Sequence, residues 1–465
     1  MSSPTATAVP ASPTPPGLFA PRLRAMTVGS VALISLLAFE ALAVGTAMPT
    51  VARSLDGLAL YGIAFGGSFA AGVLAMVVSG IWCDARGPRG PMWHGVAWFV
   101  VGLLIAGTAP VMGALVVGRV VQGFGSGLLS VALYVIVGHA YPEELHRRIF
   151  AAFAAAWVVP SLVGPALAGL IVEYLGWRWV FLAVPAVAVP AVLLIHPGLR
   201  SLDRTVPTRP PAGAAARIGW ACGAGVSAAL LHIGGQQRGA AAVVLIALAV
   251  AGLLVCAPRL LPPGFLRAAR GLPTVVGLRG LASAAFVGAE VVIPLMLSRE
   301  RGLSPTAAGL VLTVGALAWS VGSWVQGRIP LPASRASLPR AGLGCITIGT
   351  ATVALAVQPE LPVAVAVLGW AVAGLGMGLL YPSLSVLTLE LSAPGEQGRN
   401  SSSLQLGDSL FAATVLALTG AVLAAGSAPG PASYTLTLVV AAGLAALGAL
   451  LAGRVVVGGS TRPGG

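Results

Sequence analysis

Long apolar runs separated by short loops dominate this sequence of 465 residues. The loop SGIWCDARGPRGPM, residues 79–92, carries Asp84, Arg86 and Arg89 between two such runs. Each flanking run has about 20 residues, which is the length that an α-helix needs to cross the hydrocarbon core of a bilayer. The loop is therefore predicted to join two transmembrane helices, and the rest of the chain repeats this arrangement.

Composition favours a membrane protein over other classes. Hydrophobic residues make up 57% of the chain, charged residues make up 8%, and the mean hydropathy is +0.94, a balance typical of polytopic membrane proteins. The net charge of +13 comes from arginines in short loops. This distribution follows the positive-inside rule rather than forming one basic face, so we expect no nucleic-acid partner.

The cysteine, histidine and glycine patterns predict neither an enzyme nor a metal site. The four cysteines are scattered along the chain, and the five histidines lack the spacing of metal ligands. The GxGxG stretches lie inside apolar runs rather than after a strand, and the sequence contains no P-loop motif. We therefore expect no catalytic residue, no metal and no cofactor, and we expect an energy source other than ATP.

The apolar runs predict an all-α polytopic membrane protein with fourteen transmembrane helices. The predicted spans are 26–49, 59–83, 92–110, 112–139, 150–172, 177–196, 217–235, 239–257, 273–297, 305–327, 341–358, 361–389, 403–426 and 431–455. Arg22 and Arg24 directly precede the first span and place the N-terminus in the cytoplasm. Because fourteen is even, the C-terminus is predicted to be cytoplasmic too. A topology of twelve spans, which lacks the two central ones, would preserve this orientation and is the alternative to fourteen.

Arginine placement supports this topology. Most arginines fall in the predicted cytoplasmic loops of a multi-pass protein of the plasma membrane. The arginines that fall outside are Arg53, Arg178, Arg238, Arg299 and Arg301. The predicted domains are a disordered cytoplasmic tail (1–25), a six-helix bundle (26–196), a cytoplasmic linker (197–216), two inserted helices (217–257), a second six-helix bundle (273–455) and a cytoplasmic tail (456–465).

The two halves of the sequence resemble each other. VQGFGSGLL near residue 123 matches VAGLGMGLL near residue 374, with three glycines of each segment related by an offset of 251. Glu40 and Glu290 lie in the first helix of each half at nearly the same offset, and GIWCD at 80–84 has a weaker echo in GSWVQ at 322–326. These matches favour an internal duplication, as in transporters built of two pseudo-symmetric six-helix bundles.

Ionisable residues inside spans are the first functional candidates, because charge is costly in hydrocarbon. Glu40 and Arg119 lie at similar depths in the first and fourth spans, roughly 14 Å and 10 Å from the outer end, and Glu290 lies at a comparable level. Such carboxylates can bind a proton or a cationic substrate. Asp408 is a further candidate for proton or substrate binding. The alternatives are a structural Glu40–Arg119 ion pair, a Glu290 nearer the outer interface, and an Asp408 that is interfacial or a charge near the start of its helix. Arg279 is expected to snorkel to the cytoplasmic face.

Other features of the spans suggest a binding cavity and a modified helix. Tyr134, Trp157, Trp319 and Tyr381 are candidates to line the cavity, although single aromatic residues in spans are more often packing or lipid-facing residues. The fifth span contains VVPSLVGPALAGL at 158–170. Its prolines remove backbone hydrogen bonds and its glycines permit close approach, so this segment is expected to be bent and tightly packed.

Three motifs resemble those of the major facilitator superfamily. GIWCDARGPRG resembles the signature between the second and third helices, which Gly80, Asp84, Gly87 and Arg89 match. GRVVQGFGSG resembles the fourth-helix motif, which Arg119, Gln122 and Gly123 match. The fifth-helix segment resembles an antiporter motif, which Gly164, Pro165 and Gly169 match. Ala85, Pro88 and Ala168 depart from these patterns. Fourteen spans, with two inserted centrally, are similar to the drug:proton antiporter branch.

The resemblance implies a secondary transporter that exports small amphiphilic or cationic compounds in exchange for protons. It associates Arg119 with proton transfer and makes Glu40 the nearest equivalent of an aspartate that this branch usually has in its first helix. The expected partners are a small-molecule substrate, protons and the lipid bilayer, and the expected state is a monomer. The alternatives are a proton-coupled importer of a metabolite on the same fold and a non-transporting membrane sensor or flippase.

Overall fold

A computed structural model describes residues 17–200, 213–235, 237, 239–329, 335–424 and 430–456. The predicted tails up to residue 16 and from residue 457, and linker residues 201–212, lie outside the described residues. Within the described part, fourteen helical segments are long and apolar enough to cross a membrane. This confirms the expected all-α class with fourteen candidate spans and favours fourteen over the twelve-span alternative.

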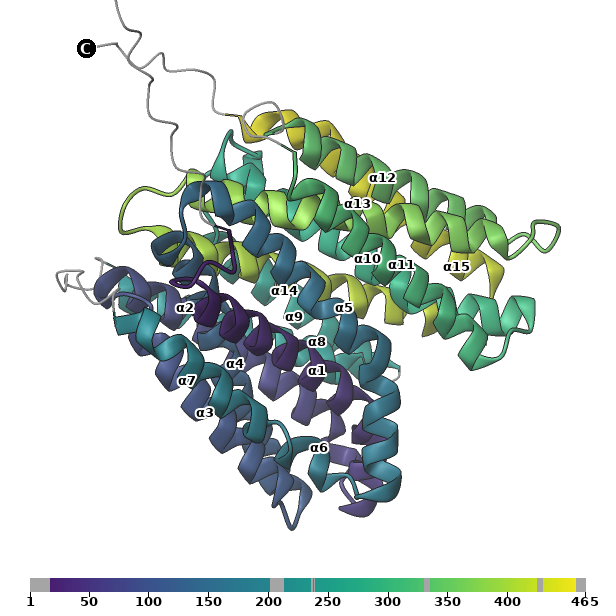
Figure 1. The fold of residues 1–465 in the computed structure, drawn as a ribbon. Coiled ribbons are helices and arrows are strands. Elements are labelled where there is room, and N and C mark those ends of the chain that lie inside the picture. The colour runs from purple at the N-terminus through teal and green to yellow at the C-terminus, as the bar shows by residue number, and fades with distance from the viewer. Residues whose placement is uncertain are drawn as a thin grey trace, which may run out of the picture.

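The helices form two bundles with a pair of helices between them in the chain (Figure 1). The first bundle contains α1 (Arg24–Ser54), α2 (Tyr61–Arg86), α3 (Arg89–Gly107), α4 (Met112–Ala140), α5 (Glu143–Tyr174), α6 (Arg178–Leu182) and α7 (Pro185–Arg200). The inserted pair is α8 (Ala214–Gly234) and α9 (Ala240–Leu260). The second bundle contains α10 (Leu272–Arg301), α11 (Pro305–Gln326), α12 (Ser337–Leu355), α13 (Ala364–Glu390), α14 (Gln397–Ala424) and α15 (Pro431–Leu451).

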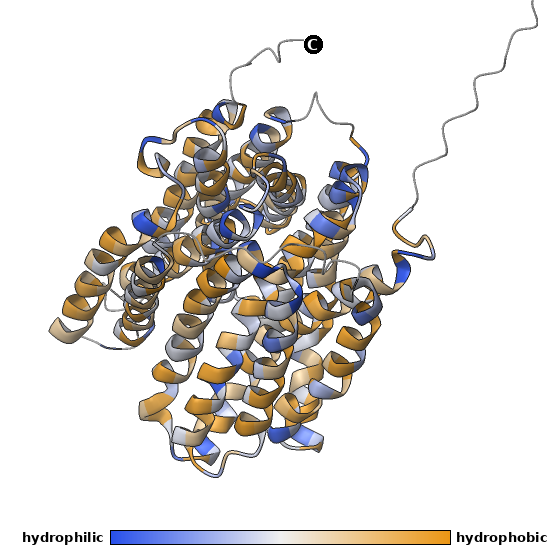
Figure 2. Ribbon diagram, turned by 90° about the vertical axis from the view of Figure 1, so that its left-hand side faces the viewer, coloured by the Kyte–Doolittle hydropathy of each residue, from blue (hydrophilic) through white to orange (hydrophobic). Residues whose placement is uncertain are grey.

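Most helix surfaces are apolar, as a bilayer requires. Figure 2 shows hydrophobic positions along much of each helix, with many hydrophilic positions near the helix ends. Buried hydrophobic residues form two clusters, one centred on the first bundle and one that joins the second bundle to α8 and α9. Each bundle therefore has its own core, with many further apolar side chains left facing outward.

The repeated glycines have the same role in both halves. A side chain on Gly123 would overlap the backbone of Ser68 in α2, and one on Gly374 would overlap the backbone of Gly315 in α11. In the same way, Gly125 packs against α3 and Gly376 against α12. The GxGxG stretches are thus helix-packing surfaces, as the sequence predicts, and α4 and α13 occupy equivalent places in their bundles.

The inserted helices lie beside the junction of the two bundles. Helix α8 packs along α2 and α9 and also contacts α14, whereas α9 contacts α14 less extensively. The bundles contact each other directly through α2 with α14 and through α5 with α11 and α13. Because α2 and α11 are equivalent helices, as are α5 and α14, the α2–α14 and α5–α11 crossings are related by the internal duplication.

Candidate transport site

Glu40 of α1 and Arg119 of α4 form an ion pair inside the first bundle. The two residues are each 7% exposed, and Nη1 of Arg119 donates to Oε1 of Glu40. The same nitrogen donates to Oε1 of Gln122, one turn further along α4. Glu40 and Arg119, which were predicted to lie at similar depths in their spans, are therefore in contact. Gln122 of the fourth-helix motif belongs to the same buried group.

A second, partly buried ion pair lies in the other bundle. Nε of Arg279 in α10 lies 3.1 Å from Oδ2 of Asp408 in α14, and the Tyr381 hydroxyl donates to Oδ1 of Asp408 over 2.8 Å. The Arg279 guanidinium also stacks over the Tyr381 ring at 3.6 Å from its centroid, and it donates to Ser385 Oγ. Arg279 is 5% exposed, so the expectation that it snorkels to the cytoplasmic face is wrong.

Glu290 differs from the other two carboxylates because it has no ion pair among the described residues. It lies eleven residues beyond Arg279 in α10, which is about three helical turns, so the two side chains share one face. Phe286 lies one turn away on this face, and its ring packs 4.3 Å from that of Trp370 and 5.4 Å from that of Trp319. A carboxylate thus lies next to an aromatic cluster.

Three of the four candidate aromatic residues gather near Arg279. Tyr381 packs 5.2 Å from Trp319, and the Tyr134 hydroxyl of α4 approaches the Arg279 guanidinium from the other bundle. Tyr134 itself packs against Phe150 of α5, with centroids 5.0 Å apart. Trp157 lies apart from this cluster and is 48% exposed. The Arg279 group therefore lies where the two bundles meet.

The loop motif fastens α2 to the start of α14. The Asp84 carboxylate accepts hydrogen bonds from the backbone nitrogens of Gly398 at 2.6 Å and Arg399 at 2.8 Å. These are among the first nitrogens of α14, which lack partners within the helix and favour a negative charge. A side chain on Gly80 would come within 2.7 Å of the Gly398 carbonyl oxygen, so glycine at this position permits the close crossing.

Gly87 and Arg89 complete the loop. Gly87 follows the last residue of α2 with a φ of 79°, a left-handed conformation that residues with a side chain adopt at a cost. Arg89 is the first residue of α3. The two residues reverse the chain between α2 and α3, and Asp84 is thereby held at the end of the helix that it fastens.

The equivalent crossing of α5 and α11 is built differently. Gln326 at the end of α11 corresponds to Asp84, and it is fully buried, but neither polar atom of its side chain has a hydrogen-bond partner among the described residues. Nη1 of Arg147 in α5 instead donates to the Ile329 carbonyl oxygen. A carboxylate therefore caps a helix at one crossing only.

The fifth-helix motif is part of one continuous helix. Pro160 and Pro165 both lie inside α5. A side chain on Gly164 would meet Phe39 and Leu42 of α1 at ordinary contact distances of 3.7–4.0 Å, whereas one on Gly169 would meet nothing within 4 Å. The prediction of tight packing is therefore wrong for Gly169, because no other segment lies within reach of a side chain at this position.

The sequence matches a known family over most of its length. Residues 29–410 match the family model described as Major Facilitator Superfamily. The chain belongs to this superfamily. It is therefore a secondary transporter rather than an enzyme, and its substrate is a small molecule. The expected family and architecture are confirmed, with fourteen spans in a multi-pass membrane protein.

Relatives of this superfamily transporter include multidrug efflux pumps. The chain is 26% identical over 377 residues to the multidrug efflux pump SdrM of Staphylococcus aureus, covering 79% of this chain and 83% of that protein. It is 26% identical over 404 residues to the multidrug transporter protein MdtP of Bacillus subtilis, covering 84% and 73%.

Solved structures of the superfamily share the fold at low identity. The human organic anion transporter MFSD10 aligns with a TM-score of 0.68 and 15% identity, over 93% of this chain and 99% of that one. A bacterial homologue of the iron transporter ferroportin, in an outward-facing state, aligns with a TM-score of 0.66 and 15% identity, over 94% and 99%.

Sequence reasoning missed how this superfamily transporter uses Arg279. The residue was separated from the functional candidates, although it pairs with one of them, Asp408. One signal was available, because Arg279 and Glu290 are eleven residues apart and must share a helix face. The partners of Arg279 in α13 and α14 could not be found this way, since they lie more than 100 residues away in the sequence.

Proposed function

We propose that this transporter exports small amphiphilic or cationic compounds in exchange for protons across the plasma membrane. The observation that carries the proposal is the buried pair of Glu40 and Arg119, which joins α1 to α4 inside the membrane-spanning bundle. A carboxylate there can be neutralised either by its arginine or by a proton, which is the property that coupling needs. The similarity to multidrug efflux pumps supports export as the direction.

Glu290 is the proposed site for the positive charge of a substrate. It is free of an ion pair among the described residues, unlike Glu40 and Asp408, and it lies one turn from the Phe286 ring. Organic cations bind well where a carboxylate adjoins aromatic faces. Proton binding at Glu40 would release Arg119, and Asp408 would exchange Arg279 for a proton in the same way.

Asp84 is the proposed latch of the transport cycle. With both termini in the cytoplasm, the α2–α14 crossing lies on the cytoplasmic side, and the contacts of Asp84 with Gly398 and Arg399 hold that side closed. Rocking of the two bundles about the site would break these bonds and open the inner side. Gly164 and Pro165 would shape the helix that packs on α1 near Glu40.

The test is proton movement in proteoliposomes that contain the purified protein and a pH-sensitive dye. A panel of lipophilic cations, such as ethidium and tetraphenylphosphonium, is expected to drive proton counterflow. Glu40→Gln is expected to abolish this counterflow, because an amide takes up no proton. Glu173→Gln, which changes an exposed carboxylate at the end of α5, is the matched control and is expected to retain it.

Two results would contradict the proposal. Substrate movement without proton movement would exclude proton coupling, and normal coupling by Glu40→Gln would reduce Glu40 to a structural partner of Arg119. The double variant Glu40→Gln, Arg119→Gln avoids an unpaired buried arginine and separates loss of coupling from loss of folding. Cotransport of substrate and proton in the same direction would favour an importer.

A further inference from the structure

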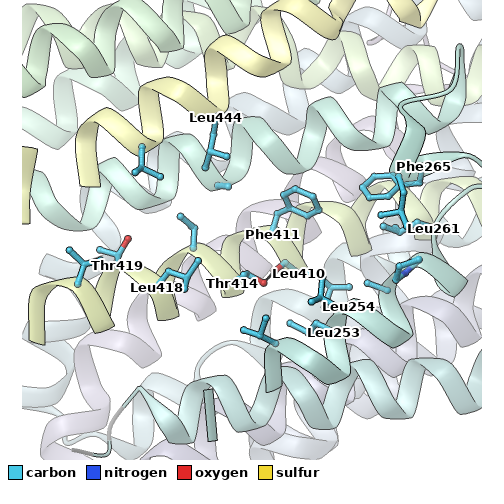
Figure 3. Close-up of a pocket in the computed structure, with 18 of the residues that line it drawn as sticks. Leu253, Leu254, Leu261, Phe265, Leu410, Phe411, Thr414, Leu418, Thr419 and Leu444 are labelled. Carbon is cyan, nitrogen blue, oxygen red and sulfur yellow. Dashed lines mark hydrogen bonds between the residues drawn. The ribbon is translucent and has the colours of Figure 1, made fainter. Parts of the chain in front are cut away.

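An apolar groove runs along the outer surface between α9 and α15, with α14 as its floor (Figure 3). Its volume is about 570 Å³, and the residues that line it include Leu254, Leu261, Phe411, Leu418 and Leu444. Among the described residues that line it, none carries a charge. The groove is separate from the groups around Glu40, Asp408 and Glu290, none of which contributes to its walls.

The groove opens toward the lipid rather than toward the centre of the transporter. Leu254 is 70% exposed, and Leu436 on the opposite wall is 52% exposed, so both walls present apolar side chains at the outer surface. The floor extends from Leu410 to Val422, thirteen residues that span about 18 Å along α14. This length is close to one leaflet of the hydrocarbon core, about 15 Å.

One end of the groove is closed and basic. The ring of Phe265 meets the ring of Phe411 edge-on, with centroids 6.1 Å apart. Phe265 belongs to a segment rich in arginine: Arg259 lies in the last turn of α9, Arg267 and Arg270 follow Phe265 within five residues, and Arg454 contacts the Arg267 backbone. Among the described residues, none of these four pairs with a carboxylate.

The basic segment is held in place against the second bundle. Nη1 of Arg454 donates to the carbonyl oxygens of Arg267 and Ala268 over 3.3 Å, and the Gly271 nitrogen donates to the Arg454 carbonyl oxygen. The Thr274 hydroxyl adds a bond to the Ala269 carbonyl oxygen. The backbone that carries Arg267 and Arg270 is consequently fixed next to Phe265, and both arginine side chains are exposed.

We propose that this groove binds an anionic phospholipid. One acyl chain lies between α9 and α15 on the floor of α14, and the phosphate lies against Arg267 and Arg270. Charge complementarity selects this occupant, because uncompensated arginines at the membrane surface attract acidic headgroups, while an uncharged channel one leaflet long fits a hydrocarbon chain. The proposal requires only the membrane-spanning fold and is independent of the transported substrate.

The test is native mass spectrometry of the purified full chain with added phosphatidylglycerol or phosphatidylcholine that carry the same acyl chains. Phosphatidylglycerol is expected to be retained selectively. Arg267→Gln combined with Arg270→Gln is expected to weaken its binding roughly tenfold or more. Arg22→Gln combined with Arg24→Gln, which removes the same charge from exposed positions near the start of α1, is the matched control and is expected to bind as the parent does.

A second arm tests the groove itself. Thr414→Phe places a ring on the floor of the channel and is expected to lower phosphatidylglycerol retention, with a thermal unfolding midpoint near that of the parent as the check on folding. Dihexanoyl-phosphatidylglycerol, which has the same headgroup on short chains, is expected to bind weakly. Equal retention of both full-length lipids, parent-like binding by the double arginine variant, or unchanged binding by Thr414→Phe would each overturn the proposal.

Discussion

Glu40, Asp408 and Glu290 are three carboxylates in membrane-spanning helices, and their surroundings differ. Glu40 faces an arginine on another helix, Asp408 faces an arginine and a tyrosine, and Glu290 has an aromatic neighbour instead of a counter-ion among the described residues. A buried arginine left without its carboxylate costs far more than a lost neutral hydrogen bond. Substitutions at these sites should therefore differ in their effect on stability as well as on transport.

Asp408→Asn is expected to destabilise the protein by about 3 kcal/mol, because it leaves the Arg279 guanidinium buried without a counter-ion. Tyr381→Phe removes one hydrogen bond to the same carboxylate and should cost about 1 kcal/mol. Thermal unfolding of the purified proteins in detergent, followed by tryptophan fluorescence, gives the order of the two midpoints. Equal midpoints would show that the ion pair contributes no more than the tyrosine hydroxyl.

The sequence was sufficient to find the carboxylates and the arginine that pairs with Glu40, but not the arginine that pairs with Asp408. Depth along a helix follows from counting residues, and this placed Glu40 and Arg119 at similar levels. The partner of Asp408 depends on how α10, α13 and α14 rotate about their axes when they pack, and those rotations depend on many apolar contacts at once. Arg279 was consequently assigned to the membrane surface, although it lies inside the bundle.

At the level of helices, the crossing of α2 and α14 depends on a glycine in each helix. A side chain on Gly398 would come within 2.9 Å of Cys83 Cβ and 2.8 Å of Asp84 Oδ1, so α14 begins directly on the end of α2. Cys83 is a free cysteine that is 4% exposed. Its accessibility therefore reports whether the crossing is closed.

Asp84→Asn is expected to accelerate the reaction of Cys83 with N-ethylmaleimide severalfold, because an amide binds the start of α14 more weakly than a carboxylate does. The experiment requires a background in which Cys222, Cys256 and Cys345 are replaced by alanine. Glu144→Gln, an exposed position at the start of α5, is the matched control. Unchanged labelling in Asp84→Asn would mean that the carboxylate does not hold the crossing closed.

Helix boundaries followed the predicted spans most closely at α4 and α11, which begin at the predicted residues 112 and 305 and end within one residue of the prediction. The largest departures are the starts of α5 at Glu143 and of α14 at Gln397, seven and six residues before the predicted 150 and 403. The sixth span consists of α6 and α7, with Pro185 at the start of α7, and it continues to Arg200 beyond the expected end at residue 196. Hydropathy shows how much apolar length is present, but it does not show whether a proline interrupts the helix. Hydropathy also fails to locate a helix end that consists of polar residues, because such an end has no hydrophobic signal.

For the whole molecule, the internal duplication determines how the two bundles meet. The equivalent crossings bring the ends of α2 and α11 against the starts of α14 and α5, and the contacts of Asp84 and Arg147 with the backbone of the other bundle lie at these ends. Alternating access requires that such contacts form and break in turn. The opposite ends of the bundles should approach each other when these crossings open.

Spin labels at Thr108 and Gln358 would measure that approach, because both residues are exposed at the ends opposite the α2–α14 crossing. In Asp84→Asn, pulsed electron resonance is expected to show a new population at shorter distance. A pair within one bundle, Thr108 and Leu58, is expected to keep its distance. A change in the control pair, or no change in the test pair, would contradict movement of the bundles as rigid bodies.

Gln326 gives the two crossings unequal strength. The Asp84 carboxylate binds two backbone nitrogens, whereas the buried amide of Gln326 has no hydrogen-bond partner among the described residues. We expect separation to start at α5 and α11, with the α2–α14 crossing as a temporary pivot. The rotation axis would then lie off the centre of the molecule, next to α8, and each opening would twist the inserted helices against the surrounding lipid.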